Sequence, residues 1–188
     1  MPLNGELISM AFTRKWFTAD LHLGHVGILN FGLSTRSFAS TEDMDKAIIE
    51  KINERVAPAD LLYILGDFAH TGDVEYVRDC FHAMNGRKIL VVGNHDLDKK
   101  GRLAKVVRDL PWDIPPTPAM ETHDNDKRIH LSHYAHRVWP ASHHGSYHFY
   151  GHSHAALPGI GRSRDVGIDM PDVGFGPTMF ADLIEGME

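Results

Sequence analysis

Short apolar runs recur along this chain, and each of them ends at a motif built from Asp, Asn or His. Runs of this length that stop at Gly or at a polar residue are typical of buried β-strands. In α/β sheets, binding sites form at the carboxyl ends of the strands, so the motifs are expected at one edge of the fold. The predicted strands are 15–18, 61–65, 88–92, 128–131 and 147–150.

Apolar residues with helical spacing lie between these predicted strands. The clearest helix is 41–55, where Ser40 suits the N-cap and Asp43 adds an acid to the first turn. Two more helices are expected at 74–84 and 101–110. The alternation of strands and helices predicts an α/β fold.

The remaining segments lack a strong periodic pattern. A further strand is expected at 166–169 and a final packed element at 178–184. Segments 111–126, 135–146 and 158–164 are expected to be connections or loops.

Length and composition limit the classes of protein to consider. The 188 residues favour one domain over 1–188, and 43% hydrophobic with 23% charged residues is ordinary for a globular protein. The net charge of -6 argues against an extended nucleic-acid footprint, although two bound dications would add positive charge at one spot. The single Cys80 and the absence of a signal-peptide or membrane pattern in residues 1–14 predict a cytoplasmic protein without a membrane partner.

The first two motifs offer carboxylate and imidazole ligands. In Asp20-Leu21-His22 the two polar side chains point to the same side of an extended segment and can reach one metal ion. Asp67, in Gly66-Asp67, could bridge two cations and hold them roughly 3.5–4 Å apart. The alternative for Asp67 is a cap on a helix that starts near Thr71.

Gly93-Asn94-His95-Asp96 is the most distinctive motif. Gly93 permits a tight turn, and Asn94 offers a neutral oxygen ligand. His95 is then free to face a substrate, and Asp96 could hold its ring by a hydrogen bond. An Asn/Asp turn with an incidental histidine is the alternative.

The last motif, Gly151-His152-Ser153-His154, carries two imidazoles that can serve adjacent metals, with a surface histidine pair as the alternative. His133 alone says little, because a buried histidine without a metal is the default. Together the motifs supply nitrogen and oxygen ligands and no cysteine, which suits Mn, Fe, Co, Ni or Zn. Paired dications of this kind hydrolyse phosphate esters.

The whole motif series, from Asp20 to His154, resembles the calcineurin-like metallophosphoesterase superfamily. DLHLGH, GDFAH and GNHD are most similar to small, uncapped bacterial or phage members. The resemblance implies two mixed β-sheets packed face to face and flanked by helices, a four-layer α/β/β/α sandwich. Protein Ser/Thr phosphatases of the superfamily carry Gly-Asp-x-x-Asp-Arg-Gly and Gly-Asn-His-Glu. This chain departs from both patterns at His70 and Asp96, which favours phosphodiesterase-like branches.

The resemblance also implies a role for each matching residue. Two metal ions would be bound, each by its own ligand set, and a hydroxide bridging them would attack phosphorus. Mn is the expected metal, and Fe, Zn, Co and Ni are the alternatives. His95 would act near the leaving group and Asp96 would orient it. The first set is Asp20, His22, His154 and bridging Asp67; the second is Asn94, His133, His152 and again Asp67.

The predicted function is hydrolysis of nucleotide-like or other small phosphodiesters. A phosphomonoesterase or a nucleotide pyrophosphatase is the alternative among enzymes, and a non-catalytic metal-binding scaffold is the alternative from another class. Arg36 could clamp a substrate phosphate, or be an ordinary surface arginine. Trp139 could stack on a base, with packing as the alternative. His25 and His70 could line the pocket, and His143 and His144 could face a substrate or be solvated loop histidines; the sequence does not decide these roles.

Overall fold

The computed structural model describes residues 13–33 and 35–187. The absence of a signal peptide was predicted from residues 1–14, which lie almost entirely outside this part. Within the described ranges, no helix is both long and apolar enough to cross a membrane.

The first sheet is mixed and has the strand order β3-β2-β1-β8. The β1–β2 and β2–β3 pairings are parallel, while β8 runs antiparallel to β1. Alternate side chains of each strand therefore face either the helices or the second sheet. The strands are β1 (Lys15–Thr18), β2 (Leu61–Leu65), β3 (Arg87–Val91) and β8 (Thr178–Met179).

The second sheet is also mixed, with the order β4-β5-β6-β7. The β4–β5 pair is an antiparallel hairpin, and β5, β6 and β7 run parallel. The strands are β4 (Ala119–Asp124), β5 (Lys127–Ser132), β6 (Tyr147–Tyr150) and β7 (Ser163–Asp165).

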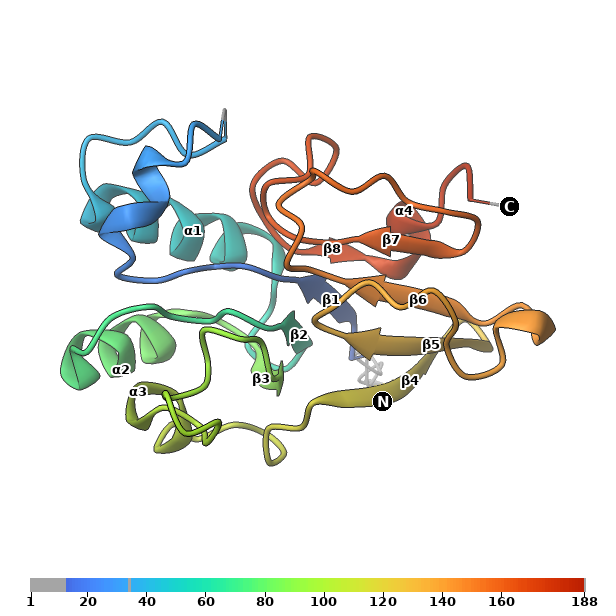
Figure 1. Cartoon of the computed structure of the whole chain (residues 1–188), viewed down its shortest axis with the longest axis horizontal. Coiled ribbons are helices and arrows are strands. Elements are labelled where there is room, and N and C mark those ends of the chain that lie inside the picture. Colours follow the sequence, from blue (N-terminus) through green and yellow to red (C-terminus); the bar gives the residue numbers. More distant parts are fainter. Residues whose placement is uncertain (1–12, 34, 188) are drawn as a thin grey trace, which may run out of the picture.

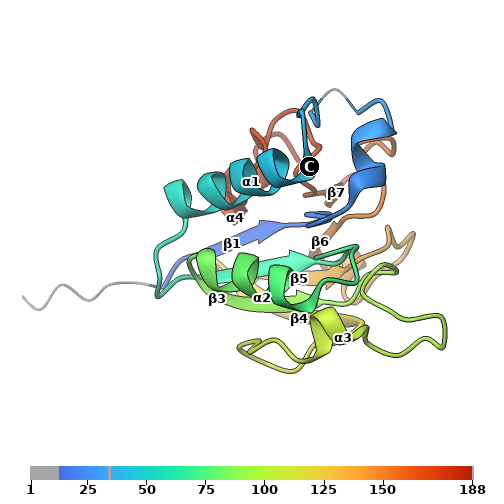
Figure 2. The same cartoon turned by 90° about the vertical axis from the view of Figure 1, so that its left-hand side faces the viewer.

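Helices cover one face of the first sheet, and the second sheet packs on its other face (Figures 1 and 2). Leu62 and Ile64 of β2 pack against the helices, while Phe17 stacks on Tyr63 and meets Phe149 edge-on between the sheets. The helices are α1 (Thr41–Arg55), α2 (Val74–Ala83) and α3 (Lys105–Arg108), with the 3₁₀ turn η1 (Val26–Asn30) beside α1. The predicted arrangement of two mixed sheets flanked by helices is confirmed.

The short helix α4 (Phe180–Leu183) adds Phe180 and Leu183 to the core between the sheets. On the outer face of the second sheet, the segment that follows β5 folds back over β6, so that Trp139 stacks on His148. The 3₁₀ turn η2 (Ser142–His144) belongs to this segment.

Most predicted elements match the structure closely. Strands 15–18, 61–65 and 147–150 and helix 41–55 have the predicted bounds, and the hydroxyl of Ser40 accepts the Asp43 amide as the N-cap. The helix predicted at 101–110 is shorter in the structure, where it spans Lys105–Arg108.

Two predictions outside these elements are wrong. The connection predicted at 111–126 contains β4, whose edge pairing with β5 outweighs a polar sequence. The strand predicted at 166–169 is a turn, and the strand β7 comes just before it. The prediction of a single domain over 1–188 stays a prediction.

Candidate metal centre

The polar motifs of both sheets meet at one edge of the molecule and are tied together through the main chain. The amides of Asp20 and His22 donate to the carbonyls of Gly66 and Asp67, at 3.0 and 2.9 Å. Both carboxylate oxygens of Asp20 accept the amide of His152, at 3.1 and 2.9 Å. The loops after β1, β2 and β6 are therefore fixed to one another before any ligand is bound.

The side chains of these loops form two groups that share one carboxylate. Potential ligand atoms of Asp20, His22 and His154 lie within 4.8 Å of one another, and so do those of Asp67, His133 and His152. The Oδ2 atom of Asp67 lies 3.5 Å from the Nε2 atoms of both His22 and His133. That spacing is long for a hydrogen bond, so these atoms have room to share a cation.

Asn94 joins the second group from the loop after β3. Its Oδ1 atom lies 2.9 Å from Nε2 of His133, while Nδ1 of His133 contacts the carbonyl of Leu65 at 2.8 Å. This second contact fixes the ring so that Nε2 points into the site, as is typical of metal-binding histidines. All seven residues predicted as ligands thus lie together in the structure.

The electrostatics of the site suit cations. Burial raises the pKa of Asp20 to about 7. Burial alone would raise the pKa of Asp67 as well, but the neighbouring His133 and His22 bring it down to about 2. Burial lowers the pKa of His22 to about 2, which keeps the neutral imidazole that a metal requires. Burial also disfavours charge on His133, yet Asp67 raises its pKa to about 9, so a cation there would compete with a proton.

One buried atom tests directly whether divalent metals fit these residues. Nε2 of His22 is buried and has no hydrogen-bond partner among the described residues. An unsatisfied buried polar atom costs about 1–3 kcal/mol, and a cation between His22 and Asp67 would satisfy it. The donor set therefore fits the two divalent ions that the motifs predict.

The backbone is strained at the same residues. Asp20, His22, Asp67, His152 and His154 all have positive φ, between 44° and 67°. A non-glycine residue in this region costs of order 1–3 kcal/mol and persists only where its surroundings enforce it. These backbone conformations accompany the convergence of the side chains on the site, and they lower the stability of the loops that carry them.

Close main-chain packing explains two glycines of the motifs. A Cβ atom at Gly93 would overlap the main chain and carboxylate of Asp67, and one at Gly66 would overlap the ring of His133. The glycines therefore let the β2 and β3 loops approach each other closely enough for Asp67 and Asn94 to face the same site.

Asp96 has a different role from the one predicted. Its carboxylate accepts three main-chain amides, from Asp67, Phe68 and Gly93, at 2.8–2.9 Å. It therefore orders the loop that carries Asp67 rather than the ring of His95. The structure thus gives the Asp96 carboxylate main-chain partners in place of the ring contact that the sequence predicted.

His95 lies where a substrate-facing residue was expected. Its amide donates to Oδ1 of Asp67 at 2.8 Å, and its ring centroid lies 5.2 Å from that of His22. It lines a pocket of about 310 Å³ that also contains candidate ligands from both groups and the apolar side chains Ile28, Phe31 and Leu33.

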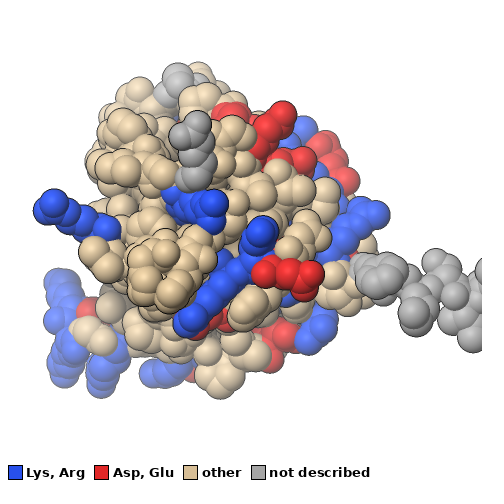
Figure 3. Space-filling view, turned by 90° about the vertical axis from the view of Figure 1, so that its right-hand side faces the viewer, with Lys and Arg blue, Asp and Glu red and all other residues tan. Residues whose placement is uncertain are grey.

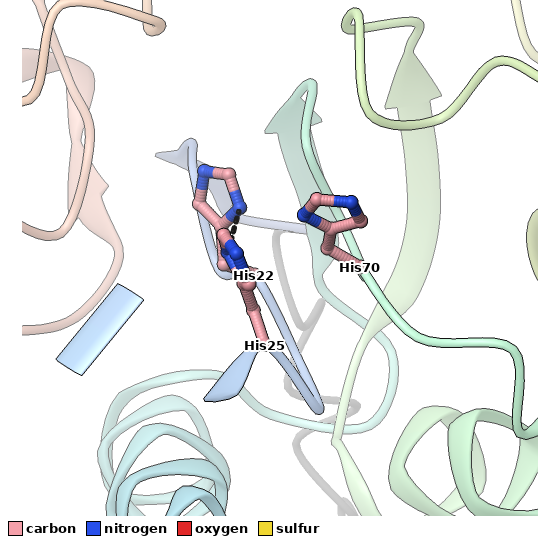
Figure 4. A group of neighbouring side chains, drawn as sticks. All are labelled: His22, His25 and His70. Atoms are coloured by element: carbon pink, nitrogen blue, oxygen red, sulfur yellow. Dashed lines mark hydrogen bonds between the residues drawn. The ribbon is translucent and has the colours of Figure 1, made fainter. Parts of the chain in front are cut away.

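His25 and His70, for which pocket lining was one of the interpretations of the sequence, border the same pocket. Figure 4 shows His22 and His25 on the loop after β1 and His70 on the loop after β2. Nδ1 of His25 lies 3.3 Å from Nδ1 of His22, and the ring of His70 lies 4.2 Å from His25 and 4.1 Å from His95. Burial and the neighbouring histidines lower the pKa of His25 to about 4.

Arg36 does not contact the pocket, contrary to the prediction that it clamps a substrate phosphate. Its side chain is buried and forms a two-pronged ion pair with Asp169, at 2.8 and 2.9 Å. Its Nη1 donates to the carbonyl of Leu21, and Nη2, one of the two nitrogens paired with Asp169, also donates to the carbonyl of Asp20. A polar stretch of sequence suggested exposure, but the fold places this arginine beneath the site.

Asp169 is the residue that sequence reasoning missed. Its Oδ2 atom accepts Nδ1–H of His154 at 2.7 Å, which orients the ring toward Asp20 and His22. Its signal in the sequence was weak, since Asp169 ends a segment predicted as a strand and matches no motif. The ion pair with Arg36 and a hydrogen bond from the hydroxyl of Thr35 hold it beneath His154.

Comparisons with known proteins agree with this geometry. Residues 13–156 match the family model described as calcineurin-like phosphoesterase. The chain is 28% identical over 88 residues to an uncharacterized protein, MJ1445, of Methanocaldococcus jannaschii, covering 46% of this chain and 49% of that protein. It is 36% identical over 98 residues to the Gene 66 protein of Mycobacterium phage D29, covering 51% and 44%. The chain thus spans about half the length of the curated relatives it matches.

A solved structure extends the similarity in fold over nearly the whole chain. A protein of unknown function from Aquifex aeolicus superposes with a TM-score of 0.65 at 24% identity. The match covers 93% of this chain and 99% of that one. At this level of identity the likeness concerns the fold.

Backbone strain at His152 can be tested by comparing glycine and alanine at that position. Because φ is 67° there, we expect metal-free His152→Gly to be more stable than His152→Ala by about 0.5–1 kcal/mol in denaturant unfolding. The same pair of substitutions at His143, in the 3₁₀ turn η2, is the control, and there alanine should be the more stable. Equal stability of the two His152 variants would refute the strain.

The buried position of Arg36 predicts a loss of stability when its charge is removed. Arg36→Met leaves Asp169 buried without its cation, so unfolding should require about 3–5 kcal/mol less free energy. Arg137→Met, at an exposed arginine, should change stability by less than about 0.5 kcal/mol. A stable Arg36→Met protein that binds phosphate substrates poorly would instead support the substrate contact.

Proposed function

Because this chain belongs to the calcineurin-like phosphoesterase family, we propose that it is a metal-dependent hydrolase of small phosphodiesters. The observation that carries the proposal is the position of Asp67. Its Oδ2 atom is equidistant, at 3.5 Å, from a histidine of each ligand group. A carboxylate between two such groups suits a pair of divalent ions, and Mn²⁺ is the metal we propose to load first.

The residues around the pocket support distinct tasks in this reaction. A bound pair of dications would supply an activated water and neutralise charge on the phosphoryl oxygens. Asp20 and Asp67 hold the loops that carry the ligands, through the amides of His152 and His95. The His95 ring borders the pocket, so its protonated form is the candidate donor to the departing oxygen.

The shape of the pocket favours a substrate that carries an organic group beside the phosphate. Phe31 is 69% exposed and, with Ile28 and Leu33, gives the pocket an apolar side next to the candidate ligands. A nucleotide-like or other small diester has such a group on both sides of phosphorus. The departures from the protein phosphatase motifs at His70 and Asp96 point the same way.

Hydrolysis of two chromogenic esters tests this function. Metal-stripped protein reloaded with Mn²⁺ should cleave bis-p-nitrophenyl phosphate faster than p-nitrophenyl phosphate. Asp67→Ala should lose the activity, whereas Asp79→Ala, at an exposed helical carboxylate, should keep it. Faster cleavage of the monoester would favour the phosphomonoesterase alternative. Metal binding without turnover of these esters, cyclic nucleotides, dinucleotides or nucleoside triphosphates would favour the non-catalytic scaffold.

Substitution of His95 distinguishes proton donation from metal binding as the role of this residue. We expect His95→Ala to keep the metal content of the parent protein and to lose about 10²- to 10⁴-fold in kcat, the usual contribution of a general acid. His143→Ala, at an exposed histidine, is the matched control and should retain full activity. Loss of metal from His95→Ala with the fold intact would count against proton donation and for a ligand role.

A further inference from the structure

Three histidines gather on the outer face of the second sheet, apart from the candidate metal centre. His130 of β5 and His148 of β6 are direct neighbours in the parallel pairing, with ring centroids 5.5 Å apart. His136, from the segment that folds back over this face, lies 5.3 Å from His130 and 5.2 Å from His148. The cluster therefore joins two strands and the covering segment.

The burial of this cluster is unusual for polar rings. His148 is fully buried and His130 is 7% exposed. Neither ring nitrogen of His130 has a hydrogen-bond partner within residues 13–33 and 35–187. Leaving such atoms unsatisfied is costly, and native structures rarely tolerate it without a bound partner. His22 shows the same property at the candidate metal centre, where a cation would satisfy its free nitrogen.

His148 is held in place from both sides. Its Nε2 and Nδ1 atoms lie 2.8 and 2.9 Å from the hydroxyls of Ser132 and Ser163, and Trp139 stacks on its ring. A cation would replace one of these serine hydroxyls. The other would still accept the remaining N–H, the contact that orients a metal-bound imidazole.

Burial, first of all, lowers the pKa of both His130 and His148 and so favours their neutral imidazoles. Burial and the neighbouring histidines lower the pKa of His148 to about 3. Burial and His136 also lower the pKa of His130, against the opposing effect of Glu121, which is itself paired with Arg128. Figure 3 shows this side of the molecule, where Lys and Arg side chains lie next to Asp and Glu side chains and uncharged surface fills the areas between these groups. A metal site in the cluster must accordingly be built from neutral nitrogen ligands.

We propose that His130, His136 and His148 form a second, separate binding site for a transition-metal ion of the Zn²⁺ class. One ring nitrogen from each residue can be chosen so that all three lie within 4.8 Å of one another. Three imidazoles with a fourth position for water are an established Zn²⁺ ligand set, and the order of affinities favours Cu²⁺, Zn²⁺ and Ni²⁺ over Mn²⁺. His136 is exposed and can move toward the two buried rings.

The ion would fasten the covering segment to the sheet. This segment begins at His133, and its next residue, Tyr134, packs against His152 with ring centroids 4.6 Å apart. Binding at His136 would therefore stiffen the chain beside two ligands of the candidate metal centre. The site itself does not depend on the proposed phosphoesterase activity.

Zn²⁺ content of matched variants tests the proposal. Metal-stripped full-length protein, His136→Asn and His143→Asn are dialysed against Zn²⁺ at equal free concentrations, and the bound metal is measured by mass spectrometry. Parent protein and His143→Asn should hold about one equivalent more than His136→Asn. The comparison is repeated with Asp67→Ala present in all three proteins, and the same difference should remain. Zn²⁺ should also raise the melting temperature of Asp67→Ala protein by more than that of the Asp67→Ala, His136→Asn double variant.

The outcomes separate this site from the proposed function. Equal Zn²⁺ content in His136→Asn and His143→Asn would overturn the site. A difference that disappears with Asp67→Ala would also overturn it, because His136 would then act on the main centre. An unchanged difference in a protein that cleaves no phosphoester would refute only the proposed function.

Discussion

The carboxylate of Asp67 is the group on which the site depends. It lies between the imidazoles of His22 and His133, accepts the amide of His95, and has its own amide held by Asp96. These contacts come from the loops after β1, β3 and β5. This buried anion, surrounded by donors and by potential cation ligands, therefore helps to hold together the loops after the strands of both sheets.

The site is costly to the fold in two ways. Several candidate ligands have left-handed backbone conformations, and polar groups such as Asp20 and His22 are fully or almost fully buried. The surrounding structure offsets these costs through the layers of apolar packing on both faces of the first sheet and through the buried Arg36–Asp169 pair. Bound cations would remove part of the remaining cost by satisfying His22 and Asp67. This balance links metal binding to stability.

The outer face of the second sheet also buries polar groups, although none of the sequence motifs lies there. Strands β5 and β6 carry apolar side chains inward and His130 and His148 outward. The chain that follows His133 covers this face, and it places His136 and Trp139 against His148. His130 and His148 are buried there. A buried ring nitrogen without a hydrogen-bond partner destabilises the fold, which indicates a role for this cluster beyond packing.

The sequence by itself determined the elements and the inventory of ligands. Apolar runs ending in Asp, Asn and His predicted the strands of both sheets that lead to the site, and helix 41–55 was predicted from its spacing and cap. These features are local: burial of alternate residues, a capping hydroxyl, and a glycine at a tight turn. The assignment of seven ligands needed more than these features, because it was implied by the resemblance of the whole motif series to a known family. The carboxyl ends of strands meeting at one edge explain why such motifs can lie together.

Only the tertiary structure decided what surrounds those ligands. Arg36 looked like a surface residue and proved to be buried; Asp96 was expected to orient its neighbour and binds three amides instead. Asp169 contacts His154 from 15 residues away, and His130 meets His136 and His148 through strand register and a folded-back segment. Side-chain partners of this kind depend on packing between distant segments. No local pattern encodes them, because their energies come from burial and charge pairing that exist only once the layers have assembled.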